Sequence, residues 1–157
     1  ITVGLATDGA GSNNSNDMLE VLKMTALLHK VEHKDPTIVT AEKVLEMATI
    51  DAAKALGLDN EIGSLEIGKK ADIIIFDPAK SAKAVPMHHP VSTLVYSSSQ
   101  ANIDTVIVDG MVVLERGSIN TADEPKVLYN TQIAADKLCQ RANICHLKNR
   151  LWRSFAY

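Results

Sequence analysis

The sequence predicts a mixed α/β fold, and three observations lead to this class. Residues 1–6 are a short apolar run typical of a strand buried on both faces, and a polar loop and a helical pattern follow it. Near residue 60 the helical spacing gives way to a β pattern, with a β-branched run at 71–77. Asp109-Gly110 then separates two apolar runs, which is the strongest short hairpin signal in the chain.

The first helix is expected to begin at Asp17, because Asp17 with Glu20 three residues later resembles a capping box. Asp35-Pro36 interrupts the helix. Apolar residues recur within it at helical spacing and predict one buried stripe: Met18, Val21, Leu22, Leu28 and Val31.

Two shorter helices are expected next. Thr40 is a suitable cap for the first of them, and the second, residues 51–56, stops at Gly57. The buried face of the helix after Thr40 is predicted from four apolar residues: Val44, Leu45, Met47 and Ala48.

The second half of the chain is predicted to be mainly β until its last helix. A strand at 71–77 precedes a helical turn at 91–96, and the hairpin strands are 103–108 and 111–114. A terminal helix is expected over about 125–147, with four candidate packing residues: Leu128, Ile133, Leu138 and Ile144.

Composition limits the classes of function. A net charge of -3 with 22% charged residues offers no broad basic surface, which argues against nucleic-acid binding. No apolar run reaches the roughly 20 residues of a membrane span, and we expect a cytoplasmic protein with Cys139 and Cys145 reduced. Because the chain starts at Ile1 within an apparent strand, we expect the natural protein to extend upstream.

Asp8 is the main candidate for chemistry, since it follows a predicted buried strand in a glycine-containing loop. A carboxylate there can bind a divalent ion through one oxygen and accept a proton at the other. The alternative is a structural Asx turn, which is the more common role of a loop aspartate.

Other candidate sites are weaker. His29 and His33 share a helix face without a third ligand, and His88 and His89 are expected to make local hydrogen bonds. The Gly9-Ala10-Gly11 sequence lacks the third glycine of a dinucleotide-binding turn, and several residues separate it from the expected helix. Three aromatic residues in the last six positions are expected to pack on a neighbouring domain or subunit: Trp152, Phe155 and Tyr157.

Three motifs resemble the amidohydrolase superfamily, in particular its methylthioadenosine/S-adenosylhomocysteine deaminase and chlorohydrolase branch. GLATDG at 4–9, with SNN at 12–14 and DMLE at 17–20, is similar to the last barrel strand and its loop. AAKALGL at 52–58 with IGSLEIGKKADIIIFD at 62–77 is similar to the return into a small β domain. HPVSTLVY at 89–96 and VIVDG at 106–110 continue the family order.

The resemblance implies the C-terminal part of a (β/α)8 TIM barrel together with the C-terminal share of a small β-sandwich. On this basis residues 1–60 contain the last barrel strand and C-terminal barrel helices, residues 61–117 belong to the β-sandwich, and residues 118–157 form a helical tail. The implied site is a mononuclear Zn²⁺ or Fe²⁺ centre in which Asp8 is the aspartate ligand. Ser12 and Asn13 are predicted to contact the substrate or brace the loop.

The resemblance also implies a function for the full protein: hydrolytic deamination of a 6-aminopurine nucleoside such as methylthioadenosine or S-adenosylhomocysteine. Guanine deamination and triazine dechlorination or deamination are alternatives on the same scaffold, and a non-catalytic structural module is a third. Because the family's histidine ligands and glutamate have no counterparts here, the fragment alone is expected to be inactive. The expected partners are the heterocyclic substrate, the remainder of its own chain and further copies in a homo-oligomer.

Overall fold

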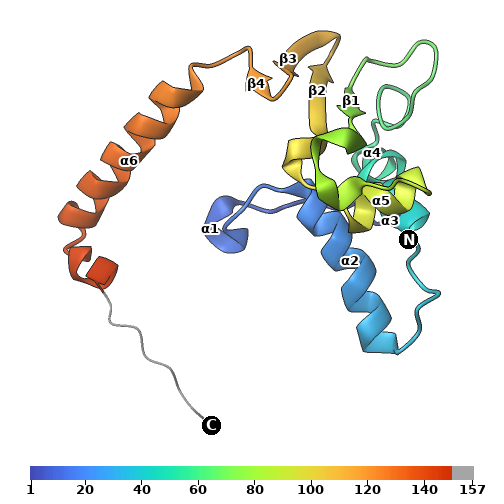
Figure 1. The fold of residues 1–157 in the computed structure, drawn as a ribbon, viewed down its shortest axis with the longest axis horizontal. Helices are drawn as coiled ribbons and strands as arrows, with labels where there is room; N and C mark the ends of the chain where they lie inside the picture. The colour runs from blue at the N-terminus through green and yellow to red at the C-terminus, as the bar shows by residue number, and fades with distance from the viewer. Residues whose placement is uncertain (150–157) are drawn as a thin grey trace. The chain divides into compact units, whose positions relative to one another are not determined.

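The computed structural model describes residues 1–149, which confirm the mixed α/β class. The chain divides into two compact units, Ile1–Ser118 and Ile119–Tyr157. Helices α1 to α5 and the strands β1 to β3 belong to the first unit, and α6 belongs to the second (Figure 1). The division at residues 60 and 117 into barrel, sandwich and tail segments stays a prediction.

Residues 1–9 lie outside any helix or strand, so the strand predicted at 1–6 is wrong for this chain. The Leu5 N–H donates to the Met47 carbonyl at 3.0 Å, and the side chain of Val3 is half exposed. A strand requires a neighbour to pair with its backbone groups, and none of the described strands pairs with this segment. The loop after it contains a single helical turn, α1 (Ala10–Asn13), that the sequence pattern did not predict.

Helix α2 (Met18–His33) begins where predicted. The Asp17 Oδ1 atom accepts from the N–H groups of Leu19 at 2.8 Å and Glu20 at 3.4 Å. The reciprocal half of the capping box is wrong, because the Glu20 carboxylate accepts from the Ser15 hydroxyl at 3.0 Å instead.

The single buried stripe predicted for α2 is also wrong. Leu22 and Ala26 are buried at 4% and 0% exposure, whereas Leu28 and Val31 are 58% and 74% exposed. At 100° per residue these two pairs lie on opposite sides of the helix. Helix α2 is therefore apolar on two sides, and the residues that the structure describes cover only one of them.

Helices α3 (Ala41–Ala48), α4 (Ile50–Leu56) and α5 (Pro90–Tyr96) form the rest of the helical layer beside α2 (Figure 1). Thr40 caps α3 by accepting from the Lys43 N–H at 3.3 Å, and Gly57 ends α4 in the left-handed region, both as predicted. Val44 is wholly buried, while the other three residues predicted with it are partly buried. The core of this layer is a cluster from α2, α3 and α5: Leu22, Ala26, Ala41, Val44 and Val95.

The described strands form a sheet in the order β1-β2-β3-β4. Their bounds are Ile73–Phe76, Ile103–Val108, Met111–Glu115 and Ser118–Ile119, and both β1 with β2 and β2 with β3 pair antiparallel. The predicted hairpin is confirmed: Asp109 and Gly110 have φ of 48° and 80°, as a type I′ turn requires. Three short 3₁₀ helices lie in the connection from β1 to β2: Pro78–Lys80, Ala82–Ala84 and Gln100–Asn102.

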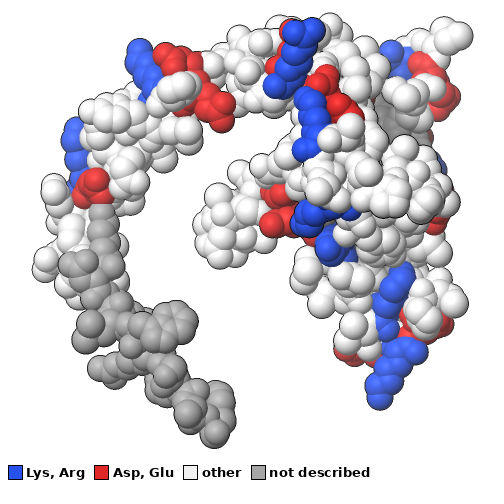
Figure 2. Space-filling view, viewed as in Figure 1, with Lys and Arg blue, Asp and Glu red and all other residues white. Residues whose placement is uncertain are grey.

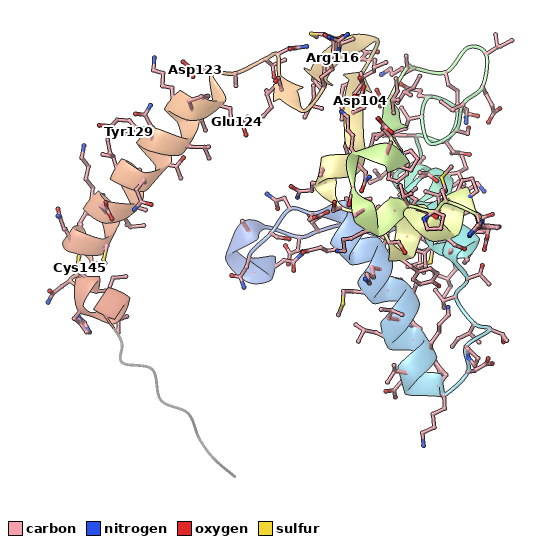
Figure 3. The ribbon with its side chains drawn as sticks, viewed as in Figure 1. Asp104, Arg116, Asp123, Glu124, Tyr129 and Cys145 are labelled. Atoms are coloured by element: carbon pink, nitrogen blue, oxygen red, sulfur yellow. The ribbon has the colours of Figure 1, made fainter. Side chains whose placement is uncertain are left out.

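The second unit contains α6 (Glu124–Arg141) and a 3₁₀ helix, Cys145–Asn149. Figure 3 shows Asp123 and Glu124 at the start of α6, where the Asp123 side chain accepts from the Lys126 N–H at 3.1 Å. The helix is shorter than predicted and ends at Arg141.

Two of the packing residues predicted for the terminal helix, Leu128 and Leu138, are mostly exposed. Cys139 is buried and Cys145 is exposed, and neither forms a disulfide, as predicted. The aromatic residues Trp152, Phe155 and Tyr157 lie outside the described residues.

Basic and acidic side chains are interspersed on the face shown in Figure 2. None of the helices within residues 1–149 has the length and apolar character to cross a membrane. The prediction that the protein does not bind nucleic acid stays a prediction.

Candidate functional site

Asp8 lies between residues 1–7, which are outside any helix or strand, and the helical turn α1, and its φ is 59°. This left-handed conformation is uncommon for a residue with a side chain, although aspartate tolerates it better than most because its carboxylate bonds locally. Gly9 follows as the N-cap of α1. The backbone therefore turns sharply at the candidate residue itself.

Both oxygens of the Asp8 carboxylate accept a hydrogen bond. The Gly9 N–H donates to Oδ1 at 2.6 Å, and the Ser12 hydroxyl donates to Oδ2 at 2.8 Å. The Gly9 N–H, and after it the Ser12 hydroxyl, lower the pKa of the Asp8 carboxyl below its ordinary value. Asp8 is consequently ionised at neutral pH, which a metal ligand requires.

Other residues of the loop form hydrogen bonds to the backbone beside Asp8. The Asn13 Nδ2 atom donates to the Thr7 carbonyl at 2.8 Å, and the Thr7 hydroxyl donates to the Asp8 carbonyl at 3.0 Å. The N–H groups of Ser12 and Asn13 both donate to the Gly9 carbonyl at 3.0 Å. The structure thus brings together the three residues that the sequence singled out, Asp8, Ser12 and Asn13.

Thr7 is a member of this network that the sequence reasoning missed. A threonine before an aspartate is a common pairing, and its two hydrogen bonds depend on the left-handed turn at Asp8, which the residue pattern does not reveal.

Asp8 has no companion ligands in this part of the molecule. The carboxylate is exposed, and residues 1–149 contain no group of three or more His, Cys, Asp or Glu side chains able to hold a metal ion. Catalytic zinc sites use three protein ligands and an open position. The charge and local geometry of Asp8 fit one ligand of such a site, and the described residues do not supply the others.

The histidines play other roles. His29 and His33 are both exposed, and their rings stack with centroids 6.4 Å apart and planes 12° from parallel. His89 makes the local hydrogen bond predicted for it, since its Nδ1 accepts from the Ser92 N–H at 3.3 Å at the start of α5. Its Nε2 lies 3.7 Å from the Glu42 carboxylate on α3.

An open hollow lies beside the loop, but it does not contain Asp8. Met24 and Leu28 give it an apolar wall, and the exposed side of α2 forms most of it. Its lining is Asn13, Glu20, Val21, Met24, Thr25, Leu28 and His29. This composition suits packing of another segment better than binding of a polar nucleoside.

Comparison with known proteins gives a consistent result. The model of the amidohydrolase family matches residues 1–113. A 5-methylthioadenosine/S-adenosylhomocysteine deaminase of Acetivibrio thermocellus is 45% identical over 138 residues, which are 88% of this chain and 32% of the relative. A 5′-deoxyadenosine deaminase of Methanosarcina acetivorans is 45% identical over 143 residues, 91% of this chain and 32% of the relative.

Solved structures agree with these matches. A zinc-bound adenosine deaminase from Xanthomonas campestris is 30% identical with a TM-score of 0.84, covering 89% of this chain and 32% of that one. A zinc complex of an atrazine chlorohydrolase from Arthrobacter aurescens is 31% identical with a TM-score of 0.75. The match covers 85% of this chain and 29% of the chlorohydrolase chain. This chain thus spans about a third of the length of the curated relatives that it matches.

Proposed function

The chain belongs to the amidohydrolase family, and from this premise we propose that the full-length protein hydrolytically deaminates a 6-aminopurine nucleoside such as methylthioadenosine or S-adenosylhomocysteine. The relatives named for such activities support this, with 45% identity across about nine-tenths of the chain. The observation that carries the proposal is Asp8, an ionised carboxylate fixed at both oxygens in the loop that matches the family.

In this proposal Asp8 binds Zn²⁺ or Fe²⁺ through one carboxylate oxygen. When bound, the ion supplies Lewis-acid activation of a water molecule near neutral pH. A carboxylate has about four lone-pair positions, and Gly9 and Ser12 occupy two of those of Asp8, so the remaining positions would be available to hold the ion and to accept a proton from water. The net reaction adds water at the purine C6 atom and releases the exocyclic amine as ammonia.

The remaining ligands come from the rest of the protein in this proposal. One carboxylate is too few for a catalytic zinc site, and residues 1–149 offer no further cluster of ligands. The 157-residue chain by itself is therefore expected to bind zinc weakly and to have no deaminase activity.

The rest of the protein also accounts for the uncovered side of α2. An apolar helix side that is open to water marks a surface for another segment to cover. We assign the side with Met24, Leu28 and Val31 to packing against the upstream part of a (β/α)8 barrel, whose last strand is residues 1–6. Residues 61–117 then belong to a β-sandwich completed by other segments of the same chain, and residues 118–157 form a helical tail.

A second candidate chemistry on this site is hydrolysis of a triazine or of guanine. The atrazine chlorohydrolase supports the first with its TM-score of 0.75, and a guanine deaminase of E. coli supports the second more weakly at 26% identity and a TM-score of 0.64. The substrate is therefore to be tested with a panel that contains adenosine derivatives, guanine and chlorinated triazines.

The decisive experiment compares two aspartate variants in the longest native polypeptide that contains this chain. Asp8→Asn is expected to lose bound zinc and to reduce turnover by at least about 100-fold. Asp35→Asn is the matched control, because Asp35 is a partly exposed loop aspartate whose carboxylate also accepts local hydrogen bonds, from the Thr37 N–H and hydroxyl. Retention of both zinc and turnover by Asp8→Asn would contradict the proposal.

A further inference from the structure

The Asp8 carboxylate is oriented before any ligand reaches it. Its Oδ1 and Oδ2 atoms are held by donors from two directions, the Gly9 N–H at 2.6 Å and the Ser12 hydroxyl at 2.8 Å. With both oxygens held, rotation of the carboxylate about χ2 breaks at least one of these bonds. The unused lone pairs therefore face a defined direction.

The two donors differ in what supports them. The Gly9 N–H is part of the backbone next to Asp8, whereas the Ser12 hydroxyl reaches back across four residues from the turn α1. That reach depends on the turn, which the N–H groups of Ser12 and Asn13 close on the Gly9 carbonyl at 3.0 Å. Ser12 is thus the loop residue whose side chain donates a hydrogen bond to the Asp8 carboxylate.

Asn13 braces the other side of Asp8. Its amide donates to the Thr7 carbonyl at 2.8 Å, and Thr7 in turn donates through its hydroxyl to the Asp8 carbonyl at 3.0 Å. These bonds hold the peptide groups on either side of a residue whose φ of 59° lies in the left-handed region, which few residues with a side chain adopt. The Asn13 amide nitrogen is therefore bonded to the backbone in the conformation that presents Asp8.

We propose that Ser12 and Asn13 are positioning residues that act through Asp8, and that neither touches the nucleoside. This inference rests on the proposed function, since it takes Asp8 as the metal ligand. Ser12 fixes the direction of the Asp8 carboxylate, and Asn13 fixes the backbone turn that carries it. Both lower the cost of organising the ligand when the ion binds.

The test uses the longest native polypeptide that contains this chain, with Zn²⁺ as the probe. Ser12→Ala is expected to weaken zinc affinity, measured by chelator competition, and kcat by about 10- to 100-fold. KM for methylthioadenosine and for S-adenosylhomocysteine stays within about twofold, because no substrate contact is lost. Asn13→Ala is expected to shift the same quantities in the same direction.

Two further variants separate positioning from general damage. Ser12→Thr keeps the hydroxyl and is expected to restore zinc affinity and kcat. Ser15→Ala is the matched control, since the Ser15 hydroxyl lies in the same loop but donates to Glu20 and not to Asp8. It is expected to behave as wild type.

Opposite outcomes overturn the inference. If Ser12→Ala raises KM for one nucleoside while zinc affinity is unchanged, Ser12 contacts substrate. If Ser12→Ala leaves zinc affinity, kcat and KM unchanged, Ser12 has no role at this site. Failure of the proposed function is distinct, because then Asp8→Asn itself keeps zinc, and the zinc measurement decides this without any turnover.

Discussion

Replacing Leu28 and Val31 together by Gln is expected to destabilise the longer protein by about 3 kcal/mol. The two side chains are 58% and 74% exposed in this chain, so most of their apolar surface is left for a partner to cover. Burying a whole Leu or Val side chain stabilises by about 1.5–3 kcal/mol, and the exposed fractions assign roughly 1–2 kcal/mol to each residue. Gln keeps good helix propensity, so the loss reports packing and not the stability of α2 itself.

The assay is denaturant-induced unfolding of the longest native polypeptide, with turnover as a second readout. In the 157-residue chain the same double substitution is expected to reduce self-association, because it removes an exposed apolar surface. Lys23→Gln, an exposed position of the same helix, is the control and should change stability by no more than about 0.5 kcal/mol. An unchanged unfolding midpoint in the longer double variant would refute the assignment of this side of α2 to an internal interface.

Three further predictions concern the described fold. Asn102 is wholly buried, donating to the Asp77 carbonyl at 2.9 Å and accepting from the Ser99 N–H at 3.1 Å, so Asn102→Ala should cost about 2–4 kcal/mol in urea unfolding. In thermal unfolding, Gly63→Ala should lower the melting temperature more than Gly68→Ala. Both glycines have positive φ, but of the two only Gly63 would bring the new Cβ against another atom, the Ala53 Cβ at 2.7 Å. The Asp51 carboxyl pKa is lowered and the Lys43 pKa is raised, chiefly by their mutual hydrogen bond at 2.6 Å. The free energy of unfolding therefore includes a contribution from this pair between about pH 4 and pH 10. The contribution is lost as pH falls through the folded pKa of Asp51 or rises through that of Lys43. It should be absent when unfolding of Asp51→Asn is measured as a function of pH.

Local signals predicted much of the fold. Asp109-Gly110 identified the hairpin because a type I′ turn needs positive φ at both residues, and few sequences other than Asn/Asp-Gly provide it. Asp17 and Thr40 located two helix starts because their side chains accept from N–H groups only two or three residues away. Each of these features is decided within a few residues of the chain.

Features that depend on distant partners were predicted less well. The spacing of apolar residues in α2 correctly indicated a helix, but the prediction grouped Leu22 and Val31 in one stripe although they lie on opposite sides of the helix and only Leu22 is buried. Periodicity shows which residues share a face, but it does not show how many faces find a partner. The same reason explains why α6 keeps Leu128 and Leu138 exposed within the described residues.

At the candidate site, too, the features formed by neighbouring residues were predicted from the sequence, and those that need distant partners were not. The spacing of four between Asp8 and Ser12 lets one helical turn carry the hydroxyl back to the carboxylate, so this hydrogen bond is formed by residues close together in the sequence. Coordination needs ligands from other strands, and pairing of residues 1–6 needs the same neighbours. In the proposed full-length protein, other strands supply both the neighbours of residues 1–6 and the further ligands beside Asp8, so backbone pairing at residues 1–6 and tight zinc binding are expected together. Tight zinc binding in a protein whose residues 1–6 stay unpaired would separate the two and contradict this explanation.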